Sequence, residues 1–417
     1  METIREQNVL NISPTISTEE IGKLIRSLPN GKAPGPDGIP NEVLKVAAPV
    51  IAKDLVKAAS HCFASGIIPE SLKESITVVL RKEGKKDYSL PGSYRPIALK
   101  NTLAKVLEKH VANIISEAAE EHGLLPWNQM GARRKRSTLS AVGLLSSCVQ
   151  TAWRTRRGCV VSMLSLDLAG AFDNVSHERL LHILKRKGFP KWLTDFVQSF
   201  LTARKTRIKF TGYESNWIQT QTGIPQGSPL SPILFLFFIS ELLEEFQRPD
   251  SGTLGFGFVD DTNLITWGDS AAENCRRLEA AHNCCAAWAN RHGAAFAPEK
   301  YQLMHFTRRR RHATADLAST VRIAGCETAP QKTSMRVLGI WVDPKLQWKE
   351  QVKKTASKGS AAFEAMSRIT ASTWGPSMRR SRLLYTATVR PAMLYGAQVW
   401  GVRDNRGTLA KSLLKPL

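Results

Sequence analysis

The sequence predicts an α+β fold, and three stretches of its hydrophobic pattern support this prediction. Apolar residues at positions 21, 24, 25 and 28 have the spacing of one helix face. Residues 159–168 and 254–266 read instead as apolar strands, the second of them as a hairpin. Residues 346–403 return to a mostly helical pattern.

Capping and turn signals predict the other elements in chain order. Ser17 and Glu20 form a capping box that opens the first helix. Residues 29–40 contain three glycines and four prolines, so they end this helix, and Pro40 opens a second helix that ends near Gly66. The remaining predictions are a strand at 76–80, helices at 177–187, 192–201, 233–246 and 271–292, a Gly/Pro-rich loop at 223–232, and strands near 301–306 and 336–342.

Length and charge limit the kind of protein this is. A chain of 417 residues is too long for one compact core, so two or three subdomains are expected. It carries 58 basic and 36 acidic residues, a net charge of +22, which favours a polyanion such as nucleic acid as the partner. The alternative is a basic protein whose lysines are merely solvated.

The cysteines and the apolar segments exclude several classes. Seven cysteines form no zinc-binding spacing and no disulfide framework, which indicates a reducing compartment. Cys284 and Cys285 are adjacent in a predicted helix, so core packing is the expected role. The N-terminus lacks the apolar core of a signal peptide. The longest apolar run, residues 233–239, is too short to span a membrane, so we expect a buried helix and no membrane partner.

Three aspartates stand at the ends of apolar strands. Asp167 ends the segment CVVSMLSLD, and Asp260 and Asp261 occupy the tip of the hairpin LGFGFVDDTNLI. A carboxylate at such a place costs desolvation energy unless it is compensated, and adjacent carboxylates repel each other. Mg²⁺ would relieve this repulsion, because it prefers oxygen ligands. The alternative is an ordinary turn, since turns favour aspartate.

Eight segments in order resemble the motifs of reverse transcriptases of LINE-type (non-LTR) retrotransposons. DLAGAFDNV at 167–175 and FVDD at 258–261 resemble motifs A and C, and TGIPQGSPLSPILF at 222–235 resembles motif B. The other matching segments are GKAPGPDGIPNEVLK at 31–45, SYRPIALKNTLAKVLEK at 93–109, NQMGARRKRST at 128–138, FAPEKYQLMHF at 296–306 and RVLGIWVDPKLQWKEQV at 336–352.

The resemblance implies a right-hand polymerase fold and an RNA-directed DNA polymerase activity. We expect an N-terminal extension and fingers at 1–158, a palm with an antiparallel sheet at 159–345, and a helical thumb at 346–417. The palm would contain a motif B insertion around 200–235. Because LINE-type proteins usually also carry an endonuclease, and none is recognisable here, the chain is expected to be a polyprotein fragment with a truncated thumb.

The resemblance also implies the site residues. Asp167, Asp260 and Asp261, with the backbone carbonyl of Leu168, would hold Mg²⁺, or Mn²⁺ as the alternative ion, and Lys300 would protonate the leaving pyrophosphate. The expected nucleotide-binding residues are Arg95, Lys82, Leu168, Phe172, Gln226 and Gly227, where the Phe172 ring would exclude a ribose 2′-hydroxyl. The expected nucleic-acid-binding residues are Gly223, Pro225, Arg133, Arg134, Leu338 and Gly339, the last two in the primer grip.

The implied partners are an RNA template, a DNA primer and dNTPs, and target-primed integration implies work in the nucleus. One departure is Val259, where many relatives carry alanine. Two alternatives stay open. An RNA-dependent RNA polymerase would share the aspartates but carry a hydrogen-bonding residue in place of Phe172. A catalytically silent RNA-binding remnant would bind RNA without extending a primer.

Overall fold

The computed structural model describes residues 9–85, 87–210, 212–247, 252–308, 316–370 and 374–401. The chain divides into two compact units. The first unit comprises Met1–Arg134, Leu168–Glu245 and Cys285–Phe296, and the second comprises Lys135–Asp167, Phe246–Cys284 and Ala297–Leu417. Each contains both helices and a sheet, so the predicted α+β class is confirmed. The boundaries of these two units differ from those expected for fingers, palm and thumb. The division into fingers, palm and thumb stays a prediction.

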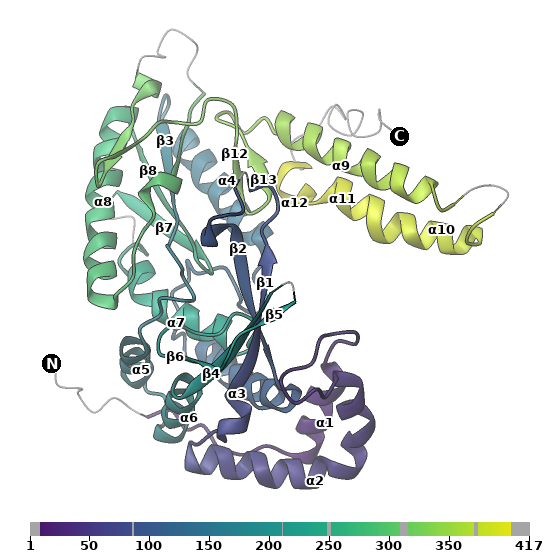
Figure 1. Cartoon of the computed structure of the whole chain (residues 1–417). Helices are drawn as coiled ribbons and strands as arrows, with labels where there is room; N and C mark the ends of the chain where they lie inside the picture. The colour runs from purple at the N-terminus through teal and green to yellow at the C-terminus, as the bar shows by residue number, and fades with distance from the viewer. Residues whose placement is uncertain are drawn as a thin grey trace. The chain divides into compact units, whose positions relative to one another are not determined.

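The first unit combines a five-stranded sheet with helices (Figure 1). The sheet runs β2-β1-β4-β5, with β6 also paired to β4. Its strands are β1 (Glu74–Arg81), β2 (Tyr94–Lys100), β4 (Arg204–Phe210), β5 (Tyr213–Glu214) and β6 (Ile218–Thr220). Its helices are α1 (Thr18–Ser27), α2 (Asn41–Ser65), α3 (Thr102–Glu121), α5 (His177–Arg186), α6 (Lys191–Leu201) and α7 (Ser231–Glu244).

The second unit is built on a four-stranded antiparallel sheet in the order β7-β8-β3-β9 (Figure 1). Its strands are β3 (Val160–Leu166), β7 (Thr253–Phe258), β8 (Asp261–Gly268) and β9 (Gln302–Phe306). Two short hairpins follow, β10 (Val321–Ile323) with β11 (Cys326–Thr328), and β12 (Met335–Val337) with β13 (Ile340–Val342). The helices are α4 (Thr138–Thr155), α9 (Lys349–Ser367), α10 (Met378–Leu384), α11 (Arg390–Leu394) and α12 (Ala397–Trp400), with a π-helical turn at Tyr385–Val389. The long helix α8 (Ala271–His292) contributes to both units.

Local signals in the sequence explain where the first helices begin and end. The Ser17 hydroxyl accepts a hydrogen bond from the Glu20 amide at 3.2 Å, and the Glu20 carboxylate accepts one from the Ser17 amide at 2.8 Å, so the predicted capping box is confirmed. Helix α2 starts after Pro40 and ends at Gly66, whose φ of 66° is left-handed. A Cβ at Gly66 would lie 2.5 Å from the Asp195 Cβ, so glycine is required there.

The apolar segments form the cores, as predicted. Residues 233–239 of α7 are all buried, and no described helix is long and apolar enough to cross a membrane. The strand at 159–168, the hairpin at 254–266 and the helix at 271–292 are confirmed as β3, β7–β8 and α8. Cys285 packs in the core as expected, but Cys284 is exposed, so the prediction of core packing is wrong for that residue.

The fold differs from the sequence prediction in several elements. The single strand expected at 336–342 is a hairpin, because Leu338 and Gly339 both have positive φ, 47° and 85°, and so reverse the chain. The sheet strands β2 and β4 were not expected from the sequence. Strand β4 reads RKTRIKF, whose basic residues hide the apolar alternation that marks a strand.

Candidate active site

Strand register brings Asp167 beside two other sequence-predicted residues of the second unit. Leu166 of β3 pairs with Thr262 of β8, and Ser165 pairs with Gln302 of β9. Continuing both registers beyond the end of β3 places Asp167 opposite Asp261 on one side and opposite Lys300 on the other. The Asp167 carbonyl also accepts a hydrogen bond from the Ala297 amide at 2.9 Å, which fixes the backbone at this end of the sheet.

The tip of the β7–β8 hairpin presents Asp260. Phe258 pairs with Asp261, so Val259 and Asp260 form a two-residue turn. The prediction that Asp261 also lies at the tip is wrong, because Asp261 is the first residue of β8. Val259 has a φ of 60°, a conformation that glycine adopts readily and that a β-branched residue adopts at a cost of about 1–3 kcal/mol. The paired strands on either side hold the turn in this shape. Strain of this kind clusters at functional sites.

The glycines of the same hairpin have a packing role. A Cβ at Gly255 would lie 2.7 Å from the Phe246 Cβ, and the Gly255 amide donates to the Phe246 carbonyl at 3.1 Å. The strand face at Gly255, which carries no side chain, is thus covered by Phe246 and its backbone.

The carboxylates at this end of the sheet repel one another. Desolvation, with the charges of Asp260 and then Asp167, raises the pKa of Asp261 to about 6, although the residue keeps exposed surface. The Lys300 Nζ lies 2.8 Å from Asp167 Oδ2 and is the cation that partly offsets this charge. A bound divalent cation would lower the pKa of Asp261 from this raised value, because it adds positive charge beside the carboxylates.

These residues fit a magnesium site of the open kind. The side-chain donors are carboxylate oxygens, which Mg²⁺ prefers, and the mutual repulsion of the carboxylates is the electrostatic condition that a cation relieves. Among the described residues, no three His, Cys, Asp or Glu side chains already stand in metal-binding geometry. Mg²⁺ is usually held by one or two carboxylates with water and substrate phosphates, so a closed protein cage is not required.

The expected gate residue, Phe172, is held by stacking in the first unit. Its ring lies 4.9 Å from the Phe235 ring with an interplanar angle of 9°. Its carbonyl accepts a hydrogen bond from the Ile224 amide at 2.8 Å. The ring is only partly buried, so it is both fixed in orientation and accessible on one side.

The predicted motif B loop packs closely on neighbouring backbone. Gly223 has a φ of 71°, and a Cβ there would lie 2.4 Å from the Asp173 carbonyl oxygen. Gly227 has a φ of 122°, and its Cβ would lie 2.6 Å from the Ala98 carbonyl oxygen. Both positions therefore require glycine because of contacts within the protein, whether or not the loop backbone also lies close to a base pair.

Gln226 and Pro225 lie in the same loop. The Gln226 side-chain amide donates to the Asp173 carboxylate at 3.2 Å, and the Gln226 main-chain carbonyl accepts from the Ala98 amide at 2.7 Å. Pro225 lines a cavity beside this loop. Asp173 stands in the segment DLAGAFDNV but was given no role from the sequence; its place in a matched motif was the available signal.

Two further residues hold the loop, and sequence reasoning missed both. Arg204 Nη2 donates to the carbonyls of Thr222 at 2.7 Å and Gly223 at 2.8 Å. The His177 Nε2 atom lies 2.8 Å from the same Gly223 carbonyl oxygen, within hydrogen-bond distance. Burial lowers the pKa of Arg204 to about 10 and also lowers the pKa of His177. No sequence signal marks Arg204, because its partners are main-chain carbonyls.

The expected triphosphate-binding residues lie at the β1–β2 hairpin. Arg95 is exposed and stands opposite Leu80 on the sheet. No ion pair engages Arg95 within the described part of the chain. Lys82 Nζ donates to the Gly92 carbonyl at 3.1 Å, so this lysine also stabilises the loop between β1 and β2.

The two arginines expected to bind nucleic acid are paired with helix α3. Arg133 Nε lies 2.7 Å from Glu120, and the Arg133 side chain is only 4% exposed, which favours a structural role. Arg134 Nη2 lies 2.7 Å from Glu117, but its side chain is half exposed and can reach a phosphate as well.

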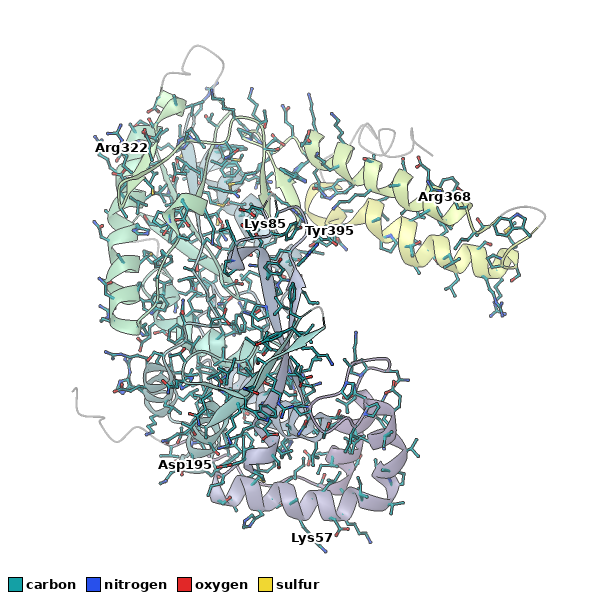
Figure 2. The ribbon with its side chains drawn as sticks, in the orientation of Figure 1. Lys57, Lys85, Asp195, Arg322, Arg368 and Tyr395 are labelled. Atoms are coloured by element: carbon teal, nitrogen blue, oxygen red, sulfur yellow. The ribbon has the colours of Figure 1, made fainter. Side chains whose placement is uncertain are left out.

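The predicted primer-grip residues form the β12–β13 turn of the second unit. The Tyr395 hydroxyl donates to the Leu338 carbonyl at 3.0 Å, and a Cβ at Gly339 would lie 3.3 Å from the same ring. Tyr395 stands at the junction of α11 and α12 (Figure 2).

Leu168, whose backbone carbonyl is expected to bind the metal, forms an isolated antiparallel β-bridge with Phe296 in the first unit.

Comparisons with known proteins identify the family of this chain. The family model described as "Reverse transcriptase (RNA-dependent DNA polymerase)" matches residues 80–342. The probable RNA-directed DNA polymerase from transposon BS of Drosophila melanogaster is 29% identical over 401 residues, which are 95% of this chain and 43% of that protein. The RNA-directed DNA polymerase from mobile element jockey of the same species is 26% identical over 392 residues, 93% of this chain and 42% of that protein.

A telomerase from Candida albicans, solved in complex with a fragment of telomeric RNA, shares 12% identity at a TM-score of 0.45, covering 87% of this chain and 67% of that one. The chain spans about two fifths of the length of the two Drosophila relatives. The family model covers more than half of this chain and includes Asp167, Asp260, Asp261 and Lys300. This chain belongs to the reverse transcriptase family and is related to the RNA-directed DNA polymerases of non-LTR retrotransposons.

Proposed function

We propose that this chain copies an RNA template into DNA, as an RNA-directed DNA polymerase of a non-LTR retrotransposon. The observation that carries the proposal is the meeting of Asp167, Asp260 and Asp261 at one end of the β3–β7–β8 sheet, with Lys300 at 2.8 Å from Asp167. The partners would be an RNA template, a DNA primer and dNTPs, and work in the nucleus is part of the same proposal.

The catalytic roles follow from the chemistry of each side chain. When bound, two Mg²⁺ or Mn²⁺ ions supply activation of the primer 3′-hydroxyl and stabilisation of the leaving pyrophosphate. Asp167 and Asp260 would be the main ligands, and Asp261 and the Leu168 carbonyl would support them. Lys300 holds a proton next to Asp167 and would deliver it to the leaving group as a general acid.

Nucleotide selection would depend on residues of the first unit. The Phe172 ring, fixed by Phe235, would collide with a 2′-hydroxyl and so select deoxynucleotides. The exposed guanidinium of Arg95 suits bidentate contact with a triphosphate, and Lys82 would add a second cation. Gln226 and Gly227 would line the pocket.

Extension of a DNA primer on an RNA template tests the proposal. The purified chain is given Mg²⁺ and either dNTPs or rNTPs, alongside Asp260→Ala. Asp269→Ala is the matched control, because Asp269 is an exposed aspartate of the same unit, paired with Arg156. We expect extension with dNTPs that Asp260→Ala abolishes and Asp269→Ala retains. Phe172→Val should admit ribonucleotides.

The alternatives predict other outcomes. Equal or preferred use of rNTPs by the unaltered chain would indicate an RNA-dependent RNA polymerase. RNA binding without extension by a folded chain would indicate an RNA-binding remnant.

A further inference from the structure

A cavity of about 410 Å³ lies in the first unit, on one face of the sheet and beside the loop that carries Gly223, Pro225 and Gln226. One wall is formed by alternate sheet residues, which share one face because strand side chains alternate: Ser75, Thr77, Ala98, Lys100, Thr206 and Ile208. Arg95 stands opposite Leu80 and points to the other face. Residues 219–226 close the cavity. Its size is within the range of ligand-binding pockets.

The side chains buried at this cavity carry an excess of positive charge. Lys100 is paired with Glu108, and their side chains are 4% and 2% exposed. Arg204 is 6% exposed. Two buried cations thus share one buried carboxylate, which also accepts a hydrogen bond from Ser228 at 2.7 Å. Buried charges are normally paired, so the cluster lacks one negative charge.

Arg204 forms no ion pair with a carboxylate among the described residues, although the charge of Glu108 acts on it. Its hydrogen bonds go to the carbonyls of Leu201, Thr222 and Gly223. Nη1 donates to none of the described residues, and the side chain lines the cavity. The fall of its pKa to about 10, caused by burial, reflects the same uncompensated charge.

Other charged groups nearby do not supply the missing anion. Lys73, half-buried in the cavity wall, adds a further cation, and burial lowers its pKa. Lys105 faces Glu108 and Asp37, and burial lowers its pKa too. The one carboxylate that lines the cavity, Asp173, is exposed and engaged by Gln226.

We infer that this cavity binds one phosphate group of the single-stranded RNA template backbone, contacted by Arg204 and Lys73. This inference rests on the proposed polymerase function. The negative charge of a phosphodiester would offset the excess positive charge of Arg204 and Lys73 at the cavity. The hydroxyls of Thr77 and Thr206, 2.7 Å apart, and the amides of Gln219 and Gln221 suit the neutral parts of a nucleotide.

Salt-dependent binding of a labelled single-stranded RNA, without primer or nucleotide, tests the inference in the full chain. Each phosphate contact contributes about −0.7 to the slope of log K against log salt concentration for single strands. Lys73→Ala should weaken RNA binding and make the slope shallower by about 0.7. The matched control is Lys57→Ala, because Lys57 is an exposed lysine of α2 that points outward from the same unit (Figure 2). It should change neither quantity.

Arg204→Gln is the second variant, since it keeps hydrogen-bond donors for the loop carbonyls but removes the charge. It should weaken RNA binding at least as much as Lys73→Ala, with the folded state verified by thermal unfolding. Inorganic phosphate and pyrophosphate are added in separate experiments as competitors. Weak competition by either supports a backbone phosphate as ligand.

Three results would overturn the inference. If Lys73→Ala raises the KM for dNTP and leaves RNA binding unchanged, the phosphate belongs to the nucleotide. If pyrophosphate binds tightly and raises the Tm of the wild type but not of Lys73→Ala, the cavity takes a free anion. If neither variant changes RNA binding, the buried charge is only structural. Because Asp260→Ala should block extension without altering RNA binding, failure of the polymerase activity is distinguishable from failure of this site.

Discussion

Lys300 Nζ lies 2.8 Å from Asp167 Oδ2, and the two side chains are 56% and 41% exposed. An exposed pair of this kind contributes only about 0–1 kcal/mol to stability. It can therefore be rearranged without unfolding the sheet when substrate and metal bind. The pairing keeps a proton donor beside a candidate metal ligand.

Removing this donor should affect the rate and not the fold. We expect Lys300→Ala to lower the single-turnover extension rate about 100-fold, as for loss of a general acid, with the Tm and RNA affinity nearly unchanged. Lys332→Ala, at an exposed lysine of the same unit, is the control. A loss of RNA affinity as large as the loss of rate would show that Lys300 contacts the nucleic acid instead.

Asp261 should make stability depend on pH and on Mg²⁺. Its folded pKa of about 6 exceeds its ordinary value of 3.8, so the folded state binds the proton more tightly and stability falls as pH rises from about 4 to 6. At pH 7.5 without metal, Asp261→Asn should be stabilising by about 1 kcal/mol or less after solvent screening. Mg²⁺ should raise the Tm of the wild type more than that of the variant, by thermal denaturation. Equal responses to Mg²⁺ would remove Asp261 from the metal site.

The strained turn at Val259 gives a test of local stability. Val259→Gly should be stabilising by about 1 kcal/mol, because the relief of positive-φ strain exceeds the added unfolded-state entropy. Val259→Ala keeps most of the positive-φ cost and should change stability less. Urea denaturation measures both. Destabilisation by glycine would mean that valine side-chain packing, and not backbone strain, dominates at the turn.

Four histidines should make the protein sensitive to acid. Burial lowers the pKa of each: His110, His177, His282 and His305. Because the folded pKa of each histidine lies below its unfolded value, these histidines contribute to the stability of the folded state above pH 6.5. This contribution is lost as pH falls, because the unfolded chain binds more protons. Asp261 acts in the opposite direction but is one group. The slope of unfolding free energy against pH between 7 and 5 should be positive, and a flat or negative slope contradicts this.

Tyr395 should hold the β12–β13 turn through its hydroxyl. Tyr395→Phe removes the 3.0 Å hydrogen bond to the Leu338 carbonyl and keeps the ring against Gly339, at a cost of about 1 kcal/mol. If the turn is the primer grip, primer–template affinity should fall several-fold while the extension rate at saturation is retained. Tyr213→Phe, at an exposed tyrosine of the first unit, is the control. An unchanged affinity would separate this turn from primer binding.

The sequence by itself determined the elements and the chemistry that depend on neighbouring residues. The capping box of α1 and the apolar periodicity of α7 and β3 are local patterns, so they predict structure without knowledge of distant contacts. The matched motifs likewise placed the three aspartates and Lys300 in order along the chain.

Only the tertiary structure decided which of these residues meet and how their charges interact. The register of β3 between β8 and β9 brings Lys300 to Asp167, and packing of β4 against the loop places Arg204 on the Gly223 carbonyl. It also decided that Arg133 is buried against Glu120. Strand register and desolvation depend on contacts between residues far apart in the chain, and periodicity along a single segment carries no information about them.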